Sequence, residues 1–423
     1  MSDVRNIVIL GASIAGLSAA HYFLRHIHPQ LPQVEGVLYR VVLVDPSSKF
    51  YWRPGTPRAT ASDRLGPDAS IFLDYQQAFR AYGEKITLVH GAATFWDSEK
   101  CVIDVKKSDG SKTVLSYHSL ILATGSRSPS PLHSLQGSDY MEVQAALHTV
   151  RKELPTAKRI IVAGGGPTGV ETAGEIAEVL NGRAGWFSSR PSNGKIEVVL
   201  LTSAERLLPL LRPEIASRAE TYLNRVGVDV RYQTRIKESE KLDTGKTRVV
   251  LHEGEVVIAD IYIPAMGMMP NTAYAPKNLL DSDGCIKMNK RTLRVDDAGP
   301  LVYALGDVGS YSKKGIVDVL MGLPVLGTNM KRDLIAAHGN PVQKPAGPDR
   351  ILAPFDPETQ LLPVGQSYGV GAVFGWRLPD LLIWLLKGGH MKAHGGQEWV
   401  DGARWKSPEW IVSSLTKTWE TVA

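Results

Sequence analysis

Gly164-Gly165-Gly166-Pro167-Thr168-Gly169 follows the apolar run Ile160-Ile161-Val162-Ala163 and precedes a segment rich in Ala and Glu. This order predicts a buried strand, a tight turn and a helix. The pyrophosphate of a dinucleotide must approach backbone N–H groups at a helix N-terminus, and glycines leave room for that approach. The turn matches the pattern GxGxxG fully, so we predict dinucleotide contacts at Gly164, Gly166, Thr168 and Gly169.

A second copy of this pattern lies near the start of the chain, where Ile7-Val8-Ile9-Leu10 leads into Gly11-Ala12-Ser13-Ile14-Ala15-Gly16. Ser13 replaces the middle glycine, and a tight strand–helix turn without a ligand is the alternative interpretation. Asp45 ends the next predicted strand, where a carboxylate accepts hydrogen bonds from ribose hydroxyls. The predicted cofactor contacts of this copy are Gly11, Ser13, Ala15, Gly16 and Asp45.

The second unit lacks a carboxylate at the position that corresponds to Asp45. Its strand, residues 197–201, ends in Thr202 and Ser203, with Arg206 shortly after. Without an acidic group the turn does not repel a 2′-phosphate, and Arg206 could pair with one. Thr202 and Arg206 therefore favour NADPH at least as much as NADH. The alternative is that Arg206 is a solvated helix residue and that the site accepts both cofactors.

Three shorter segments end later predicted strands, namely Ala123-Thr124-Gly125, Ala265-Met266-Gly267 and Leu305-Gly306-Asp307. Each alone could be a strand running into a turn. Their order and spacing, however, resemble those of the two-dinucleotide-binding flavoproteins with a glutathione-reductase-like fold. The resemblance implies that the first segment crosses back to the FAD domain and that Asp307, after Gly306, bonds the ribitol chain of FAD. It also assigns Asp45 to the ADP half of FAD. The predicted cofactor contacts of these segments are Ala123, Thr124, Gly125, Gly267, Gly306 and Asp307.

The cysteine content limits which group of these flavoproteins the chain can resemble. Cys101 and Cys285 are the only cysteines and are far apart in sequence, which excludes the thiol pair of the disulfide reductases. The chain is similar to the apoptosis-inducing-factor-like group, which includes the ferroptosis suppressor flavoprotein, with the type II NAD(P)H:quinone dehydrogenases as cousins. The similarity continues into the segment Val364-Gly365-Gln366-Ser367-Tyr368-Gly369-Val370-Gly371.

The resemblance also implies residues near the two reacting rings. The segment after Asp45, from Lys49 to Arg58, would lie against the flavin, with Arg53 and Arg58 as cationic neighbours. Glu171 would orient the nicotinamide, as the corresponding acid does in type II dehydrogenases. The group also places a lysine beside the flavin. It aligns here with either Lys313 or Lys314, one residue out of register, and we take Lys314 as the candidate.

We therefore expect an α/β protein with two Rossmann-like dinucleotide-binding domains and a small C-terminal α+β module. The FAD-binding domain would take residues 1–153 and return at 273–345, while residues 154–272 would bind NAD(P)H. Residues 346–423 would form the C-terminal module, which contains six of the nine tryptophans.

Composition excludes several other classes of protein. The formal net charge of +5 has no clustered Lys/Arg run, so no nucleic-acid partner is expected. No run of about 20 apolar residues and no targeting signal stands out, so the cytoplasm is the expected location. His390 and His394 have helical spacing, but glycines on both sides indicate a loop, and we expect no metal.

The sequence thus predicts an oxidoreductase that passes a hydride from NADPH or NADH to FAD and then electrons to a quinone or similar small acceptor. The alternatives are a tailoring flavoenzyme for a dedicated small metabolite, or a redox-sensing interaction protein with little turnover. Residues 376–387 form an apolar segment too short to span a bilayer. We expect it either to pack in the core or in a homodimer, or to lie at a membrane surface.

Overall fold

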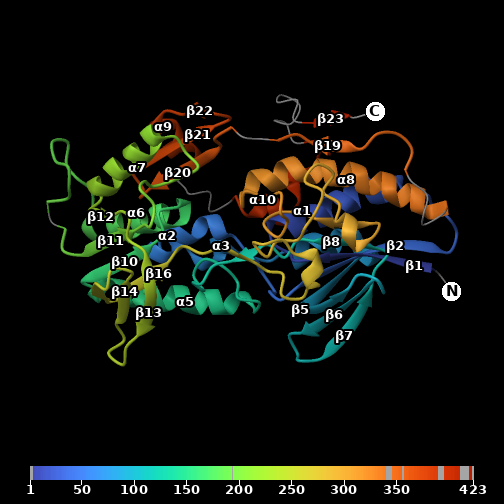
Figure 1. Cartoon of the computed structure of the whole chain (residues 1–423), viewed down its shortest axis with the longest axis horizontal. Helices are drawn as coiled ribbons and strands as arrows, with labels where there is room; N and C mark the ends of the chain where they lie inside the picture. The colour runs from blue at the N-terminus through green and yellow to red at the C-terminus, as the bar shows by residue number, and fades with distance from the viewer. Residues whose placement is uncertain are drawn as a thin grey trace.

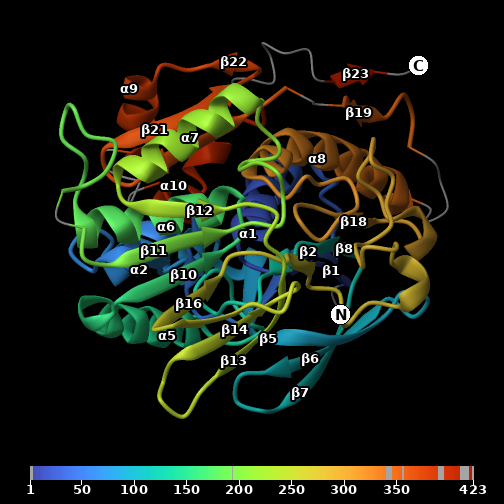
Figure 2. The same ribbon diagram turned by 60° about the vertical axis from the view of Figure 1, so that its left-hand side comes forward.

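The computed structural model describes residues 3–192, 194–339, 345–354, 357–388, 395–409 and 419–421. Its largest sheet has seven strands in the order β18-β8-β1-β2-β5-β6-β7 (Figure 1, and Figure 2 for β18). The strands from β18 to β5 pair in parallel, and the second half of β5 continues into an antiparallel ribbon with β6 and β7. The strand bounds are β1 (Asp3–Leu10), β2 (Val37–Asp45), β5 (Ile86–Asp97), β6 (Val102–Lys107), β7 (Lys112–Ser116), β8 (Ser119–Leu122) and β18 (Val302–Ala304).

The apolar runs of the sequence form the buried centre of this sheet. Ile7, Val8 and Ile9 of β1 are fully buried, because side chains on both faces of the strand are covered. One face packs into the main core, with α1 (Ile14–Tyr22) and α8 (Ile316–Gly339), while the other packs into a smaller cluster around Trp96. A parallel sheet covered on both sides is the arrangement that the predicted βαβ unit requires.

A second, four-stranded parallel sheet has the order β12-β11-β10-β16. Its strands are β10 (Arg159–Ala163), β11 (Glu197–Leu201), β12 (Val228–Arg231) and β16 (Ile261–Pro264). Helices α6 (Pro167–Asn181) and α7 (Pro213–Arg225) pack on it. An antiparallel ribbon completes this unit, with β13 (Ile236–Lys241), β14 (Thr247–Leu251) and β15 (Val256–Ala259). The mixed α/β architecture confirms the predicted fold class, whereas the domain boundaries stay predictions.

The C-terminal residues contact both halves of the molecule. Strands β20 (Gln360–Val364), β21 (Tyr368–Val373) and β22 (Trp376–Arg377) form a small antiparallel sheet against α6 and α7 (Figure 2). The short helix α9 (Asp380–Ile383) and the π-helical turn η8 (Trp384–Gly388) follow. Farther along, α10 (Gln397–Val400) packs on α1, where His21 hydrogen-bonds to the carbonyl of Val400.

One buried ion pair joins the two halves directly. Helix α2 (Thr56–Ala61), which follows the predicted flavin segment, packs along α6 of the second unit. Arg58 on α2 donates from Nη2 to Oε1 of Glu175 on α6 at 2.6 Å, and its Nε lies 3.1 and 3.2 Å from the two carboxylate oxygens. Both side chains are almost completely buried. The geometry is bidentate, so the guanidinium satisfies the carboxylate at the helix contact.

Removal of this cation is expected to destabilise the fold strongly. In Arg58→Met, Glu175 would stay buried without a partner, and the free energy of unfolding should fall by about 3–5 kcal/mol at pH 7. Burial raises the pKa of Glu175, so the unpaired carboxyl would take up a proton at a higher pH in the folded protein than in the unfolded chain. The loss should therefore shrink at pH 5. Urea unfolding at both pH values measures it.

The matched control is Arg231→Met, which removes a half-exposed pair with Glu255. Such surface pairs contribute about 0.2–1 kcal/mol, so this variant should lose little stability. Equal losses in the two variants would contradict a special contribution of the buried pair.

Candidate functional site

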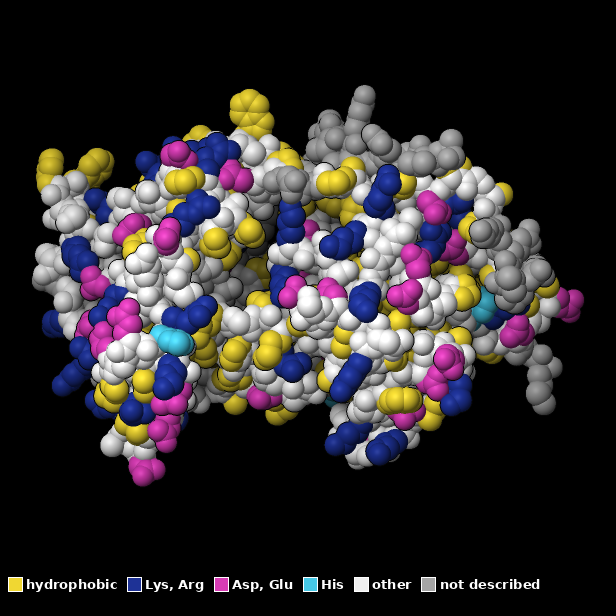
Figure 3. Space-filling view, in the orientation of Figure 1, with side chains coloured by type: hydrophobic (Ala, Val, Ile, Leu, Met, Phe, Trp, Pro, Cys, Tyr) yellow, Lys and Arg dark blue, Asp and Glu magenta, His cyan; other side chains and the backbone are white. Residues whose placement is uncertain are grey.

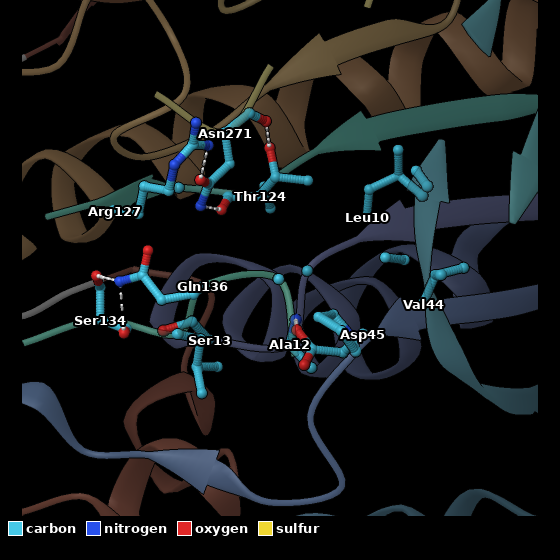
Figure 4. A pocket seen from close by; sticks show the side chains of 18 of the residues that line it. Leu10, Ala12, Ser13, Val44, Asp45, Thr124, Arg127, Ser134, Gln136 and Asn271 are labelled. Atoms are coloured by element: carbon cyan, nitrogen blue, oxygen red, sulfur yellow. Dashed lines mark hydrogen bonds between the residues drawn. The ribbon is translucent and has the colours of Figure 1, made fainter. Parts of the chain in front are cut away.

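A cavity lies at the carboxyl ends of β1, β2 and β8, where the predicted FAD contacts converge (Figure 4). Its lining includes Gly11, Ser13, Asp45, Thr124 and Gly125. This edge is where ligands bind in open parallel sheets, since the strand order reverses beside β1. The structure therefore places Gly11 in one cavity with Gly125, which lies 114 positions later in the sequence.

The glycine turn of this cavity has no room for side chains. Gly11 has φ +102°, and a Cβ there would lie 2.4 Å from the carbonyl oxygen of Ala123. A Cβ on Gly16 would lie 1.6 Å from the carbonyl oxygen of Gly11. Ser13 is the N-cap of α1, and within the described structure its side chain makes no capping hydrogen bond. The turn thus leads directly into a helix N-terminus, which suits a phosphate.

Asp45 is buried at the end of β2 and points toward this turn (Figure 4). Its Oδ2 accepts from the backbone N–H of Ala12 at 2.5 Å, and its Oδ1 accepts from the N–H of Ser47 at 2.7 Å. Burial raises the pKa of Asp45 to about 6, although both N–H donors oppose the shift. Each oxygen has a second lone pair, so the carboxylate can still accept from ligand hydroxyls.

At the end of the cavity predicted to hold the flavin, two loops that run between the two halves hydrogen-bond to each other. Thr124 donates to the carbonyl of Asn271, and Asn271 donates back to the carbonyl of Thr124. Arg127 donates to the side-chain oxygen of Asn271 at 3.0 Å. Sequence reasoning missed Arg127, Asn271 and Gln136, all of which line the cavity. Asn271 stands four residues after Gly267 and could have been found from that position, whereas Gln136 lies in a loop without a motif.

The remaining residues predicted for the flavin have the following positions. Arg53 lines the cavity and donates to the carbonyl of Ser126 at 3.2 Å. Asp307 accepts from the Ser126 hydroxyl at 2.8 Å, next to Gly306, whose φ is +77°. Arg58 is engaged by Glu175 in the buried ion pair. The roles of these residues toward a flavin stay predictions.

The second glycine turn repeats the geometry of the first. Gly164 has φ +131°, and a Cβ there would lie 2.4 Å from the carbonyl oxygen of Ala265. A Cβ on Gly169 would lie 1.8 Å from the carbonyl oxygen of Gly164. Gly166 is the N-cap of α6, and Thr168 lies in its first turn. In both halves, therefore, the first glycine of the turn lies close to the backbone carbonyl at the end of a neighbouring parallel strand.

The residues predicted to favour NADPH at least as much as NADH, Thr202 and Arg206, follow β11. Thr202 is buried, and a Cβ on Gly165 would meet its Oγ1 at 2.6 Å. The guanidinium of Arg206 donates to the carbonyls of Leu211 and Pro209 at 2.9 and 3.0 Å. Arg206 would have to leave these carbonyls, or use its remaining N–H groups, to reach a 2′-phosphate.

The two residues predicted for the reaction itself lie on different elements. Glu171 on α6 is buried and accepts from the ammonium of Lys387 at 2.6 Å. Lys314, with φ +63°, donates to the carbonyl of Met268 at 3.2 Å. Cys101 and Cys285 are both free. No described residues form a metal-binding cluster, and His390 and His394 lie outside the described ranges.

Comparisons with known proteins agree with this geometry. A sequence model of the family described as pyridine nucleotide-disulphide oxidoreductase matches residues 5–322. The chain is 40% identical to "Oxidoreductase phnG" of Penicillium herquei, over 97% of this chain and 98% of that protein. It is 30% identical to ferroptosis suppressor protein 1 of Taeniopygia guttata, over 72% and 79%. A ferredoxin reductase of Rhodopseudomonas palustris has a TM-score of 0.60, with 20% identity and 86% and 87% coverage. The resemblance stated from the sequence is confirmed.

Retention of FAD should depend on the ionisation of Asp45. In the predicted complex the ribose hydroxyls donate to the carboxylate, so the affinity for FAD should fall as the pH drops below about 6, the pKa of Asp45. In Asp45→Asn the affinity at pH 8 should be about 10–100-fold weaker, because a hydrogen bond to a charged group contributes about 1.5–3 kcal/mol. The fluorescence of released flavin, measured from pH 5 to 8, reports both effects.

The asparagine variant supplies its own control, since it has no carboxyl to titrate. Its release curve should be flat near pH 6. A step of equal size in the variant would show that another group controls FAD retention.

Proposed function

The chain belongs to the pyridine nucleotide-disulphide oxidoreductase family, and we propose that it transfers electrons from NAD(P)H to a quinone or similar small organic acceptor. Proteins of this family bind FAD and NAD(P)H. The observation that carries the proposal is the repeated glycine turn, at Gly11 and at Gly164, in which a backbone carbonyl occupies the space of a side chain. Two such turns in one chain suit two dinucleotides.

FAD, when bound, supplies the acceptor for the hydride. In the proposed complex the turn at Gly11 and the carboxylate of Asp45 hold the ADP half, while Asp307 and Arg53 hold the other end. The turn at Gly164 and the N-terminus of α6 hold NAD(P)H. The protein's task is then to align the two rings within about 3–3.5 Å and to exclude water.

A small organic acceptor fits the cysteine arrangement. Both cysteines are free, and neither belongs to a CxxC pair, so the chain lacks the usual dithiol relay from flavin to a substrate. The resemblance favours a quinone. A dedicated metabolite is the second candidate, because the relative matched along nearly its whole length is named only as an oxidoreductase. A redox sensor with little turnover is the third.

Steady-state oxidation of NADPH and NADH with a panel of quinones tests the proposal. We expect turnover with short-chain quinones well above that with oxygen alone. Because Thr202 carries no charge, kcat/KM for NADPH should equal or exceed that for NADH. A large preference for NADH that persists in Arg206→Ala would show that this loop was misinterpreted.

The double variant Cys101→Ser/Cys285→Ser is the control and should keep most of the turnover, since no thiol is placed in the electron path. A reduced complex with negligible turnover on every acceptor would support the sensor. Turnover with a single metabolite and no quinone would support the tailoring enzyme.

We also propose peripheral membrane contact through residues 376–387. Leu381 and Leu385 are 68% and 61% exposed, whereas Ile383 between them is buried. Hydrophobic side chains occur along the upper edge of the view in Figure 3, where β22 and α9 lie in Figure 1, and acidic and basic groups are interspersed over this face. None of the helices that the structure describes could cross a bilayer. The exposed leucines therefore suit a surface contact or a homodimer.

Co-sedimentation with anionic liposomes tests this contact. Each leucine that enters lipid contributes up to about 1.5–3 kcal/mol, so Leu381→Glu/Leu385→Glu should lose at least about tenfold in affinity. Val114→Glu/Met141→Glu is the matched control, because these side chains are both 63% exposed and lie elsewhere. Wild-type protein that stays in the supernatant contradicts the membrane contact, and a lipid-free dimer disrupted by the leucine variant supports self-association.

A further inference from the structure

Helix α6 presents three carboxylates whose partners come from other parts of the chain. Glu175 pairs with Arg58 of α2. Glu178 accepts from the backbone N–H and the hydroxyl of Ser367, at the turn between β20 and β21. Glu171, which is the nearest of the three to the glycine loop in sequence, pairs with Lys387 of η8. The acidic face of this helix therefore contacts both the first unit and the C-terminal residues.

The surroundings of the pair between Glu171 and Lys387 hold the lysine ammonium by two hydrogen bonds. The ammonium lies 2.6 Å from Oε1 of Glu171 and donates a second hydrogen bond to the carbonyl of Leu361 on β20 at 2.9 Å. The side chain of Glu171 is 6% exposed and that of Lys387 is 25% exposed. Lys387 thus reaches inward from the segment that bears the exposed leucines, and its head group is fixed at two points.

Lys387 is the cation in direct contact with Glu171. The other positive group that faces Glu171 is Arg58 of α2, which is already bound to Glu175. The pKa of Glu175 is raised by burial and also by the charge of Glu171, because the two carboxylates repel each other. The pKa of Glu171 is raised by burial, while the charges of Lys387 and Arg58 lower it. Loss of Lys387 would leave a buried carboxylate without a partner, which favours its neutral form.

We propose that Lys387 is a positioning residue of the NAD(P)H site, which holds the carboxylate of Glu171 in place and in its charged form. The proposal rests on the proposed function and on the predicted role of Glu171, which is to orient the nicotinamide. In the proposed reaction the hydride would pass with its two electrons from nicotinamide C4 to FAD, which is thereby reduced, and the nicotinamide ring would be left positively charged. A fixed anion beside the ring stabilises that charge more in the product than in the reduced donor. Under this proposal the C-terminal segment contributes Lys387 to the nucleotide site.

The test uses FAD-loaded protein with two readouts. The first is the rate of flavin reduction by NADPH from pH 5 to 9, and the second is the affinity for NADP⁺ by titration calorimetry. In Lys387→Met the pKa of Glu171 should rise, so the acidic limb of the rate profile should move to higher pH. The affinity for NADP⁺ at pH 7 should fall about 5–10-fold. Lys387→Arg should restore both, because arginine keeps the charge.

The variant Glu171→Gln completes a cycle of mutations. Added to Glu171→Gln, Lys387→Met should change neither the pH profile nor the affinity, since no carboxylate remains to be held. Lys406→Met, which removes an exposed lysine of the same C-terminal region, is the matched control and should behave like wild type. Unfolding midpoints of all variants show whether each remains folded.

Three results would overturn the proposal. They are an unchanged pH profile in folded Lys387→Met, an equal effect of Lys387→Met in the Glu171→Gln background, and a Glu171→Gln variant that reacts like wild type. In each of these cases reduction of the wild-type flavin by NAD(P)H would still support the proposed function. Wild-type flavin that NAD(P)H does not reduce would contradict the function itself.

Discussion

The architecture depends on one steric constraint that occurs twice. At Gly11 and at Gly164 the turn after a central strand packs against the carbonyl of the neighbouring returning strand, 2.4 Å from where a Cβ would be. This contact sets how closely the helix after the turn approaches the sheet, and so where its N-terminal N–H groups point. Any L-residue with a side chain would push the two strands apart and also meet an unfavourable φ. The positions of the two predicted ligand-binding edges follow from this contact.

Helix α6 connects these two edges to each other. Its N-terminus follows the second glycine turn, and its acidic face bonds to α2 and to the C-terminal sheet. Buried ion pairs contribute little net stability compared with apolar packing, but they define one relative placement because a mismatch leaves charges unpaired. Arg58 with Glu175 thus favours a single orientation of α6 on α2. In the proposed reaction the nicotinamide and flavin rings must be aligned, so a fixed orientation of α6 matters more for the rate than added stability of the fold.

Much of the fold was predictable because its determinants are local. The strands, the glycine turns and Asp45 lie within short stretches whose spacing has a direct physical meaning. The ion pairs were not predictable, since Arg58 and Glu175 are 117 residues apart and Glu171 and Lys387 are 216 apart. Only the packing of whole elements brings them together. The placement of residues 376–387 was ambiguous from the sequence, because an apolar run does not reveal which of its side chains face solvent. In the structure Ile383 faces inward, and Leu381 and Leu385 face outward.

The strand order of the first sheet also has a consequence for synthesis. Strand β8 lies between β1 and β18, but β18 leaves the ribosome about 180 residues later, after every strand of the second sheet. The nascent chain must therefore carry β8 with one edge unpaired while the second unit emerges and folds. The second sheet, formed by one continuous stretch, can close first. The interrupted first sheet closes only after β18 has emerged, so we expect its unpaired edge to be a site at which chaperones protect the nascent chain.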